Sequence, residues 1–168
     1  MPSSPFVVQL GELRRSMGTR RAEQRHGPLP GLRVTSSGVP EGADVAVDVL
    51  LEAVPGGVIA RGTVGAPWAG ECRRCLGEAS GVVTTEVVEL FEDDHDPEHT
   101  YPLEPDRLDL APLARDAVLL ELPLAPLCDE HCRGLCPMCG IDRNQGDCEC
   151  RPEVSDPRWA ALDALSDS

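Results

Sequence analysis

The sequence contains no lysine, and all fifteen of its basic residues are arginine. Aromatic residues make up only 3% of the chain, so aliphatic side chains must supply most of a core. A net charge of −14 over 168 residues argues against a protein that binds nucleic acid over its whole surface. No stretch is apolar enough to span a membrane, and residues 1–10 lack the basic start and apolar run of a secretory signal. We therefore expect a cytoplasmic protein whose cysteine thiols stay reduced.

Cysteine, by contrast, is abundant: the chain has eight, and six of them lie within residues 128–150. The other two form a Cys-x-x-Cys pair upstream. In a reducing compartment, paired cysteines indicate metal or redox chemistry more than a disulfide framework. A structural zinc ion takes four thiolate or imidazole ligands, and one Cys-x-x-Cys turn supplies two of them. We therefore predict one or two structural zinc ions, and the candidate ligands are Cys72, Cys75, Cys128, Cys132, Cys136, Cys139, Cys148 and Cys150.

These cysteines can be divided between two sites in more than one way. One arrangement has a local site made of Cys136, Cys139, Cys148 and Cys150, while Cys128 and Cys132 reach back to Cys72 and Cys75. Its local site costs little loop entropy because the four ligands lie within fifteen residues. The other arrangement is a zinc ribbon built from the two Cys-x-x-Cys turns, with the other four cysteines held more loosely. An iron–sulfur cluster uses the same ligands and stays open as an alternative to zinc.

Residue patterns typical of enzymes are missing. A thioredoxin-type site needs a helix after its first cysteine, but residues 77–81 are glycine-rich and precede a predicted strand. Neither a Gly-x-Ser-x-Gly nor a His-Glu-x-x-His pattern occurs. His95 and His99 stand among carboxylates and could bind a divalent metal weakly, but a solvated loop is the simpler interpretation. His131 could replace a cysteine ligand, although we expect it to be solvated. We therefore expect no enzymatic activity.

Positive charge is concentrated near the N-terminus. Residues 1–40 contain six arginines and two acidic residues, so the remainder of the chain carries about −18. Because arginine suits phosphate groups, residues 14–26 could form a basic arm on RNA. The alternative is a solvated, partly helical face that pairs with the protein's own acidic loop at residues 92–109. The candidate RNA-binding residues are Arg14, Arg15, Arg20, Arg21 and Arg25.

Hydrophobic periodicity predicts three consecutive strands. Residues 43–53 alternate between apolar and mostly polar side chains, which is the pattern of a half-buried strand. A Pro-Gly-Gly turn follows, then a returning strand over residues 58–69 and a third over residues 82–91. Residues 6–10 read as a further edge strand. The three central strands, joined by a hairpin and a Cys-x-x-Cys turn, predict an antiparallel meander.

A helix is predicted from Asp109, as its N-cap, to about Leu122, with an apolar stripe toward the sheet. A short helix over residues 160–165, anchored by Trp159, should end the chain. The expected fold class is α+β: an antiparallel β-meander with a packed helix and a cysteine-rich, zinc-binding C-terminal segment. We divide the chain into a core at 1–127, with a basic arm at 14–33 and an acidic, mobile loop at 92–109, and a metal-binding segment at 128–168.

Four blocks of sequence, in this order and spacing, resemble the bacterial YceD family of large ribosomal RNA subunit accumulation proteins. The blocks are ECRRCL at 71–76, ELPLAPLC at 121–128, GLCPMCG at 134–140 and DPRWA at 156–160. The resemblance extends from the strand at Phe6 to Trp159. It implies a cytoplasmic, non-enzymatic factor needed for the synthesis, processing or stability of large-subunit (23S) ribosomal RNA.

Two functional hypotheses follow from the resemblance and from the charge distribution. In the first, the protein binds ribosomal RNA through its arginines, and zinc has a structural role. In the second, it is an interaction module that binds a ribosomal protein or a processing enzyme through its acidic loop and a sheet edge. Both hypotheses place its partners among ribosomal RNA and large-subunit assembly proteins, with no membrane and no small-molecule substrate.

Overall fold

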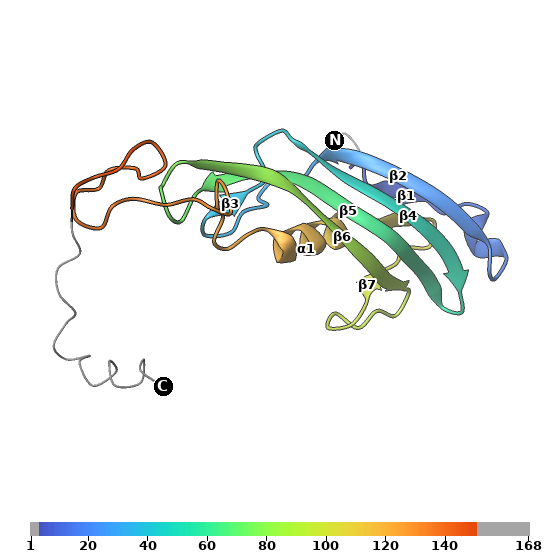
Figure 1. The fold of residues 1–168 in the computed structure, drawn as a ribbon. Helices are drawn as coiled ribbons and strands as arrows, with labels where there is room; N and C mark the ends of the chain where they lie inside the picture. Colours follow the sequence, from blue (N-terminus) through green and yellow to red (C-terminus); the bar gives the residue numbers. More distant parts are fainter. Residues whose placement is uncertain (1–3, 151–168) are drawn as a thin grey trace, which may run out of the picture.

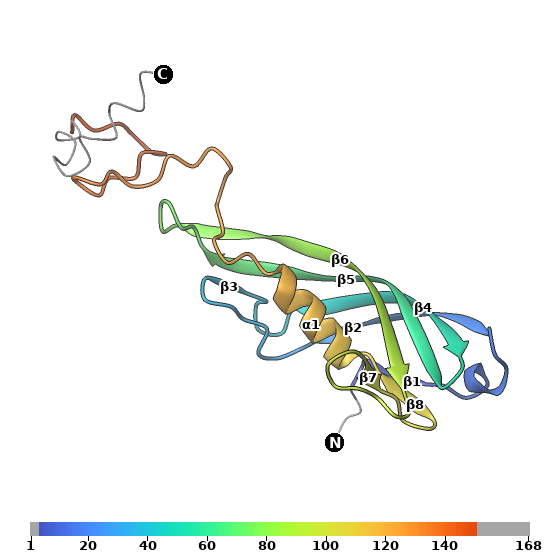
Figure 2. The same ribbon diagram turned by 90° about the horizontal axis from the view of Figure 1, so that it is seen from below.

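A long, twisted and mostly antiparallel sheet carries the helix α1 on one of its faces (Figures 1 and 2). The computed structural model describes residues 4–150. In chain order the elements are β1 (Val7–Gln9), the 3-10 helix η1 (Leu13–Arg15), β2 (Arg20–Pro28), β3 (Ser37–Gly38), β4 (Asp44–Val54), β5 (Gly57–Glu71), β6 (Glu78–Glu92), β7 (Tyr101–Pro102), β8 (Arg107–Asp109) and α1 (Ala111–Glu121).

The main sheet has the strand order β2-β4-β5-β6-β7, and β3 pairs with β5. β4, β5 and β6 are consecutive antiparallel neighbours, which confirms the predicted meander. The turn between β4 and β5 contains Gly56, whose φ of +78° suits glycine. The turn between β5 and β6 is the first Cys-x-x-Cys motif. Both strands are longer than predicted and carry this turn away from the helix.

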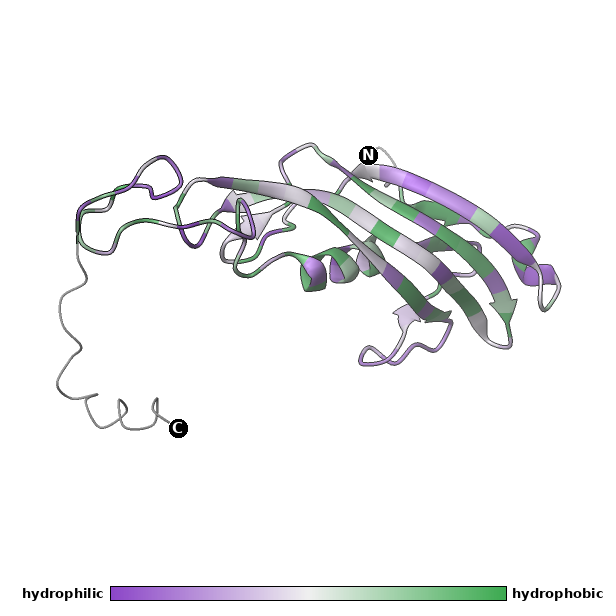
Figure 3. Ribbon diagram, in the orientation of Figure 1, coloured by the Kyte–Doolittle hydropathy of each residue, from purple (hydrophilic) through white to green (hydrophobic). Residues whose placement is uncertain are grey.

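The core lies between the sheet and α1. The inward-facing residues of β4 are no more than 5% exposed, as their alternation predicted: Val45, Val47, Val49, Leu51 and Ala53. Figure 3 shows hydrophobic and hydrophilic bands alternating along the central strands. α1 buries Leu113, Ala114 and Val118. At its start the Ala111 N–H donates to Asp109 Oδ1 at 2.9 Å, so Asp109 satisfies a free helix donor from just before the helix. No helix within residues 4–150 is long and apolar enough to cross a membrane.

The N-terminal third differs from the expected basic arm. Residues 20–28 form β2, which pairs with β4 along its whole length, so this segment is neither a free arm nor helical. The acidic loop is also more structured than predicted, because β7 and β8 lie within it. β8 pairs with β1 in a separate two-stranded sheet, so residues 6–10 do not edge the main sheet. The predicted helix at 160–165 and Trp159 lie outside the described residues.

Candidate metal centre

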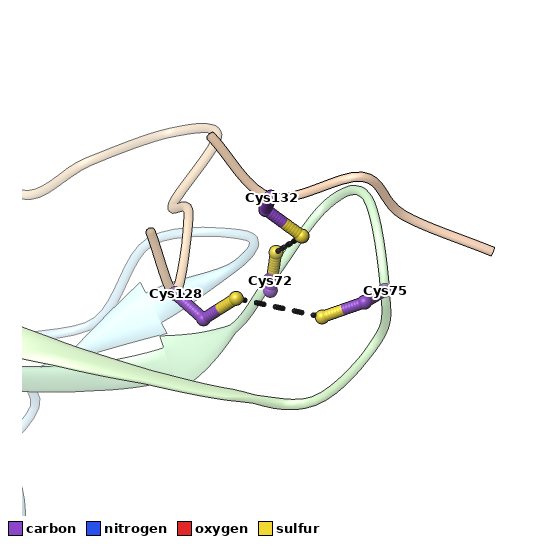
Figure 4. A group of neighbouring side chains, drawn as sticks. All are labelled: Cys72, Cys75, Cys128 and Cys132. Carbon is purple, nitrogen blue, oxygen red and sulfur yellow. Dashed lines mark hydrogen bonds between the residues drawn. The ribbon is translucent and has the colours of Figure 1, made fainter. Parts of the chain in front are cut away.

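The two cysteine segments meet beyond the end of the sheet where β5 turns into β6 (Figure 1). Four sulfurs gather there, with Cys72 Sγ 3.8 Å from Cys132 Sγ and Cys75 Sγ 3.6 Å from Cys128 Sγ (Figure 4). All four Sγ atoms lie within 4.8 Å of one another. We call Cys72, Cys75, Cys128 and Cys132 the sheet quartet. These distances exceed the roughly 2.05 Å of a disulfide, so the sulfurs are grouped without being bonded.

Backbone hydrogen bonds hold the two halves of the sheet quartet together. The Cys-x-x-Cys turn is closed by the Leu76 N–H, which donates to the Cys72 carbonyl at 2.9 Å. The Arg73 N–H then donates to the Pro126 carbonyl at 2.9 Å, joining the turn to the segment that follows α1. The Ser37 hydroxyl secures that segment further back through the Pro123 carbonyl, at 2.8 Å. The prolines that end the helix thus direct the chain along the end of the sheet and bring its cysteines to the turn.

A small apolar cluster surrounds the sheet quartet. Cys72 and Cys132 are buried with Ala79, and Trp68 and Leu127 pack against them. Trp68 also packs against the main core. The sheet quartet is therefore continuous with the interior of the protein.

The other four cysteines form a second group in the loop that follows. Their sulfurs also lie within 4.8 Å of one another, and we call Cys136, Cys139, Cys148 and Cys150 the hook quartet. Around it, the Cys136 N–H donates to the Ile141 carbonyl and the Gly140 N–H to the Cys136 carbonyl, both at 2.9 Å. In this quartet only Cys136 is buried; Cys139 and Cys150 are exposed. The hook, residues 133–150, is thus folded around its own sulfurs.

Within the sheet quartet the thiols differ strongly in acidity. Burial alone would raise the pKa of Cys72, but the backbone N–H groups of Cys128, Cys75 and Arg74 outweigh burial and lower that pKa to about 6. The neighbouring thiols of Cys75 and Cys132 raise the pKa of Cys128 to about 12. The turn therefore favours one thiolate, and the crowding of sulfurs opposes the next. A bound cation would relieve that repulsion.

The hook quartet repeats this arrangement. The N–H groups of Cys139 and Met138 lower the pKa of Cys136 to about 6, because they donate toward its sulfur. The thiol of Cys139 is the main cause that raises the pKa of Cys150 to about 12. Two independent turns thus provide the same chemistry: N–H groups that stabilise one thiolate, with three further sulfurs close by.

The grouping of the eight sulfurs is the first of the two arrangements considered from the sequence. A ribbon would place the two Cys-x-x-Cys turns together, whereas here each turn has its own partners. Among the described residues, none of the histidines belongs to a group that could hold a metal ion. His131 is exposed, and His99 pairs instead with Asp96, Nδ1 to Oδ2 at 2.9 Å.

The five candidate RNA-binding arginines all have acidic partners within the protein. Arg14 pairs with Asp93 of the acidic loop, the contact expected under the alternative interpretation. The remaining ion pairs are Arg15 with Glu12, Arg20 with Glu52, and both Arg21 and Arg25 with Glu23.

Glu23 is the centre of the most buried of these contacts. Its side chain is 11% exposed, and its carboxylate lies 2.7 Å from Arg21 Nε and 2.6 Å from Arg25. The Arg21 Nε contact lacks hydrogen-bond geometry, so its attraction is ionic. All three side chains point to the core side of β2, in register with apolar residues of β4. Charged residues that point inward on an edge strand discourage pairing with other chains, which gives Arg21 and Arg25 a structural role.

Two residues that are not candidate ligands also support the quartets. Arg74 donates through Nη1 to the carbonyls of Glu130 and Cys132, at 3.1 and 2.9 Å. Asn144, in the hook, donates from Nδ2 to Cys132 Sγ at 3.3 Å, and its Oδ1 accepts from the Arg133 N–H at 2.7 Å. The arginine inside the first Cys-x-x-Cys turn offered a weak signal for a charge near thiolates. Asn144 offered none, because its partner belongs to the other quartet.

Similar proteins are found in bacteria and in a chloroplast. An uncharacterised protein of Mycobacterium tuberculosis is 38% identical over 170 residues, covering 95% of this chain and 81% of that protein. An uncharacterised protein of Mycobacterium leprae is 32% identical over 175 residues, covering 95% and 76%. An Arabidopsis thaliana protein, named as chloroplastic homolog 1 of the large ribosomal RNA subunit accumulation protein YCED, is 34% identical over 65 residues, covering 39% and 20%. No solved structure matches the chain.

The family model described as large ribosomal RNA subunit accumulation protein YceD matches residues 60–166. The match begins in β5 and takes in both Cys-x-x-Cys turns, α1 and all eight cysteines. It covers well over half of the chain, and the protein therefore belongs to the YceD family.

Proposed function

We propose that this protein is a non-enzymatic, zinc-stabilised factor that supports the synthesis, processing or stability of large-subunit (23S) ribosomal RNA during ribosome assembly. The name of its family refers to the accumulation of that RNA. The observation that carries the structural part of the proposal is the pair of four-sulfur groups. We place the protein in the cytoplasm, with ribosomal RNA or large-subunit assembly proteins as its partners.

Sulfur spacing supports a single tetrahedral ion in each quartet. Zinc–thiolate bonds of about 2.3 Å place neighbouring sulfurs of a tetrahedron about 3.8 Å apart. The two measured pairs of the sheet quartet, at 3.6 and 3.8 Å, agree with that spacing. An iron–sulfur cluster places several irons and sulfides between its thiolates, so it needs them farther apart. Four protein ligands fill the coordination sphere of zinc and leave no position for a substrate, as in structural sites.

Metal analysis tests this part of the proposal. Protein purified anaerobically without added metal should contain two zinc ions per chain by elemental analysis. Removing them with a chelator should unfold the region around both quartets, because metal binding and folding are coupled in such sites. A fully folded chain without metal would contradict the zinc proposal.

The effect on RNA is tested in cells. Depletion of the protein should lower the ratio of 23S to 16S ribosomal RNA, and expression of the wild-type chain should restore it. We assign no catalytic residue. We therefore expect no single substitution to abolish the effect by removing a catalytic group while the fold and the zinc content stay intact. An unchanged ratio after depletion would contradict the role in RNA accumulation.

One observation favours action through protein contacts over direct RNA contact. The five arginines that could form an RNA surface already pair with the protein's own carboxylates. If these arginines bound phosphate groups instead, their carboxylate partners would be left unpaired close to the RNA. Arg15 and Arg20 are the most exposed of them, with side chains 75% and 62% exposed. If RNA is bound directly, the double variant Arg15→Ala/Arg20→Ala should weaken binding, and affinity should fall steeply with salt. Partners that co-purify from nuclease-treated lysate would favour protein contacts.

A further inference from the structure

A groove runs beside α1, between the helix, β6 and residues 95–102. It consists of two adjoining hollows of about 690 and 140 Å³, which share Glu89, Tyr101, Asp116 and Leu120 as walls. We call this continuous feature the α1 groove. It lies apart from the two quartets, on the part of the sheet where β7 joins β6 (Figure 2).

The α1 groove is negatively charged, and its charges have no internal counterions. Four acidic side chains line it, and no arginine does: Glu89, Glu98, Asp116 and Glu121. Within residues 4–150 none of the four forms an ion pair. Asp116 accepts a hydrogen bond from the Tyr101 hydroxyl at 2.9 Å, and Glu121 accepts one from the Thr85 hydroxyl at 3.4 Å. β2 differs from the groove in this respect, because its arginines form ion pairs with carboxylates of the same protein.

The same groove offers apolar contact. Leu120 projects from α1 with 84% of its surface exposed, and Leu119 and Tyr101 line the larger hollow beside it. Long basic side chains carry aliphatic stems that pack on such surfaces while their charged ends meet carboxylates. Apolar walls with an acidic rim therefore suit arginine or lysine better than a small cation.

The groove borders an open strand edge. β6 pairs with β5 over fifteen residues on one side, but on the other side it pairs with β7 only at Phe91 and Glu92. In the described part of the chain, no strand pairs with the remaining outer edge of β6, residues 78–90. An open edge of this length is a template for an added strand from another chain.

We propose that the α1 groove and the outer edge of β6 bind an extended, arginine- and lysine-rich segment of another protein. This inference rests on the proposed function in the version in which the protein acts through contacts with other proteins, and it identifies the surface that makes those contacts. RNA is disfavoured as the occupant because its phosphates would meet four carboxylates that have no ion-pair partner within residues 4–150. A second copy of this chain carries a charge of −14 and is disfavoured for the same reason. Residues 151–168 contain two arginines and four acidic residues, so they also have the wrong charge.

The test uses the full chain with its metal and a short fluorescent peptide of alternating arginine and valine. The double variant Glu89→Gln/Glu98→Gln removes two groove charges. Its matched control, Glu41→Gln/Asp44→Asn, removes two exposed charges outside the groove. At low salt we expect the groove variant to bind the peptide about tenfold or more weakly than wild type, and the control less than about twofold more weakly. Equal losses in the two variants would show attraction to net charge alone and would overturn the proposal.

Two further probes separate strand addition from simple charge attraction. The same peptide with alternate backbone nitrogens methylated keeps its charge but cannot complete a hydrogen-bonded ladder, so it should bind more weakly. Equal binding of the methylated peptide, or tighter binding of a single-stranded RNA probe to the groove, would overturn the proposal. These measurements are independent of RNA levels in cells. Loss of peptide binding and loss of the 23S ribosomal RNA effect can therefore be told apart.

Discussion

The sheet quartet and the hook quartet have the same four donors but connect very different lengths of chain. Cys75 and Cys128 of the sheet quartet are 53 positions apart, whereas all four cysteines of the hook quartet lie within fifteen residues. Closing the longer loop removes more conformational freedom from the unfolded chain, by about 1.1 kcal/mol from the logarithmic dependence on loop length. The sheet quartet should therefore contribute more to global stability.

The surroundings of the two quartets sharpen this difference. Cys72 and Cys132 are buried in an apolar cluster that Trp68 joins to the main core. The hook quartet has one buried cysteine and is supported mainly by its own backbone turns. Identical donor sets thus serve two purposes: one secures the end of the sheet, and the other folds a segment too short and polar to fold alone.

The largest expected effect comes from breaking the sheet quartet. Cys72→Ser should reduce the zinc content from two ions to one per chain and lower the thermal midpoint by more than about 10 °C. The physical reason is that it leaves three crowded sulfurs in the apolar cluster without their ion and releases the segment after α1. Differential scanning calorimetry with metal analysis on the same sample checks both. A variant that loses its zinc and keeps its midpoint would remove the distinction between the quartets.

Breaking the hook quartet should have a smaller, local effect. Cys139→Ser should also remove one zinc ion per chain, but the thermal midpoint of the core should fall by only a few degrees because this site closes a short loop. Hydrogen exchange should show lost protection in residues 133–150 and unchanged protection in β4 to β6. Loss of protection across the sheet would mean that the two sites fold as one unit.

Much of the fold was accessible from the sequence because it rests on local patterns. The alternation in β4, the Pro-Gly turn and the proline-bounded helix are set by neighbours in the chain. β2 was missed because the residues it turns toward the core are Arg21, Glu23 and Arg25, so the apolar alternation that signals a strand is absent. Ion pairing there takes the place of apolar packing.

The eight candidate metal ligands could be predicted from the sequence, but their division between two sites could not. Spacing favours the hook quartet as a local unit, yet equally allows two Cys-x-x-Cys turns to meet. What decides is a contact between distant backbones: the Arg73 N–H donates to the Pro126 carbonyl and brings Cys128 to the first turn. The same limit hid Asn144, because its hydrogen bond to Cys132 exists only after both segments are in place.

A glycine pair tests how the hook attaches to the sheet quartet. Gly134 and Gly140 both have positive φ, at +69° and +74°, so alanine strains the backbone at either position. A β-carbon at Gly134 would also lie 2.8 Å from the Arg74 carbonyl, whereas one at Gly140 meets nothing within 4 Å. Gly134→Ala should therefore lower the free energy of unfolding by about 2 to 3 kcal/mol and Gly140→Ala by about 1 kcal/mol. Denaturant titration measures both, and equal losses would show that the Arg74 contact is unimportant.

The smallest expected effect concerns the bond that links the two quartets. Asn144 Nδ2 donates to Cys132 Sγ, and such hydrogen bonds around a metal ligand typically change metal affinity by about ten- to a hundredfold. Asn144→Ala should weaken zinc binding at the sheet quartet near the lower end of that range. Competition with a chromogenic chelator, performed on chains that keep all eight cysteines so that the hook stays folded around its own zinc, measures the change.

Two companion variants separate this bond from general disorder of the hook. Asn144→Asp keeps the Oδ1 that accepts from the Arg133 N–H but places a second oxygen against the thiolate, so it should weaken zinc binding more than alanine does. Gln145→Ala removes only a hydrogen bond to Asp142 and should leave the affinity unchanged. If the aspartate variant binds zinc as tightly as wild type, the Nδ2 donor has no role. The expected result is the largest loss of zinc affinity in Asn144→Asp, a smaller loss in Asn144→Ala and none in Gln145→Ala. That order would mean that the hook strengthens zinc binding at the sheet quartet through one hydrogen bond.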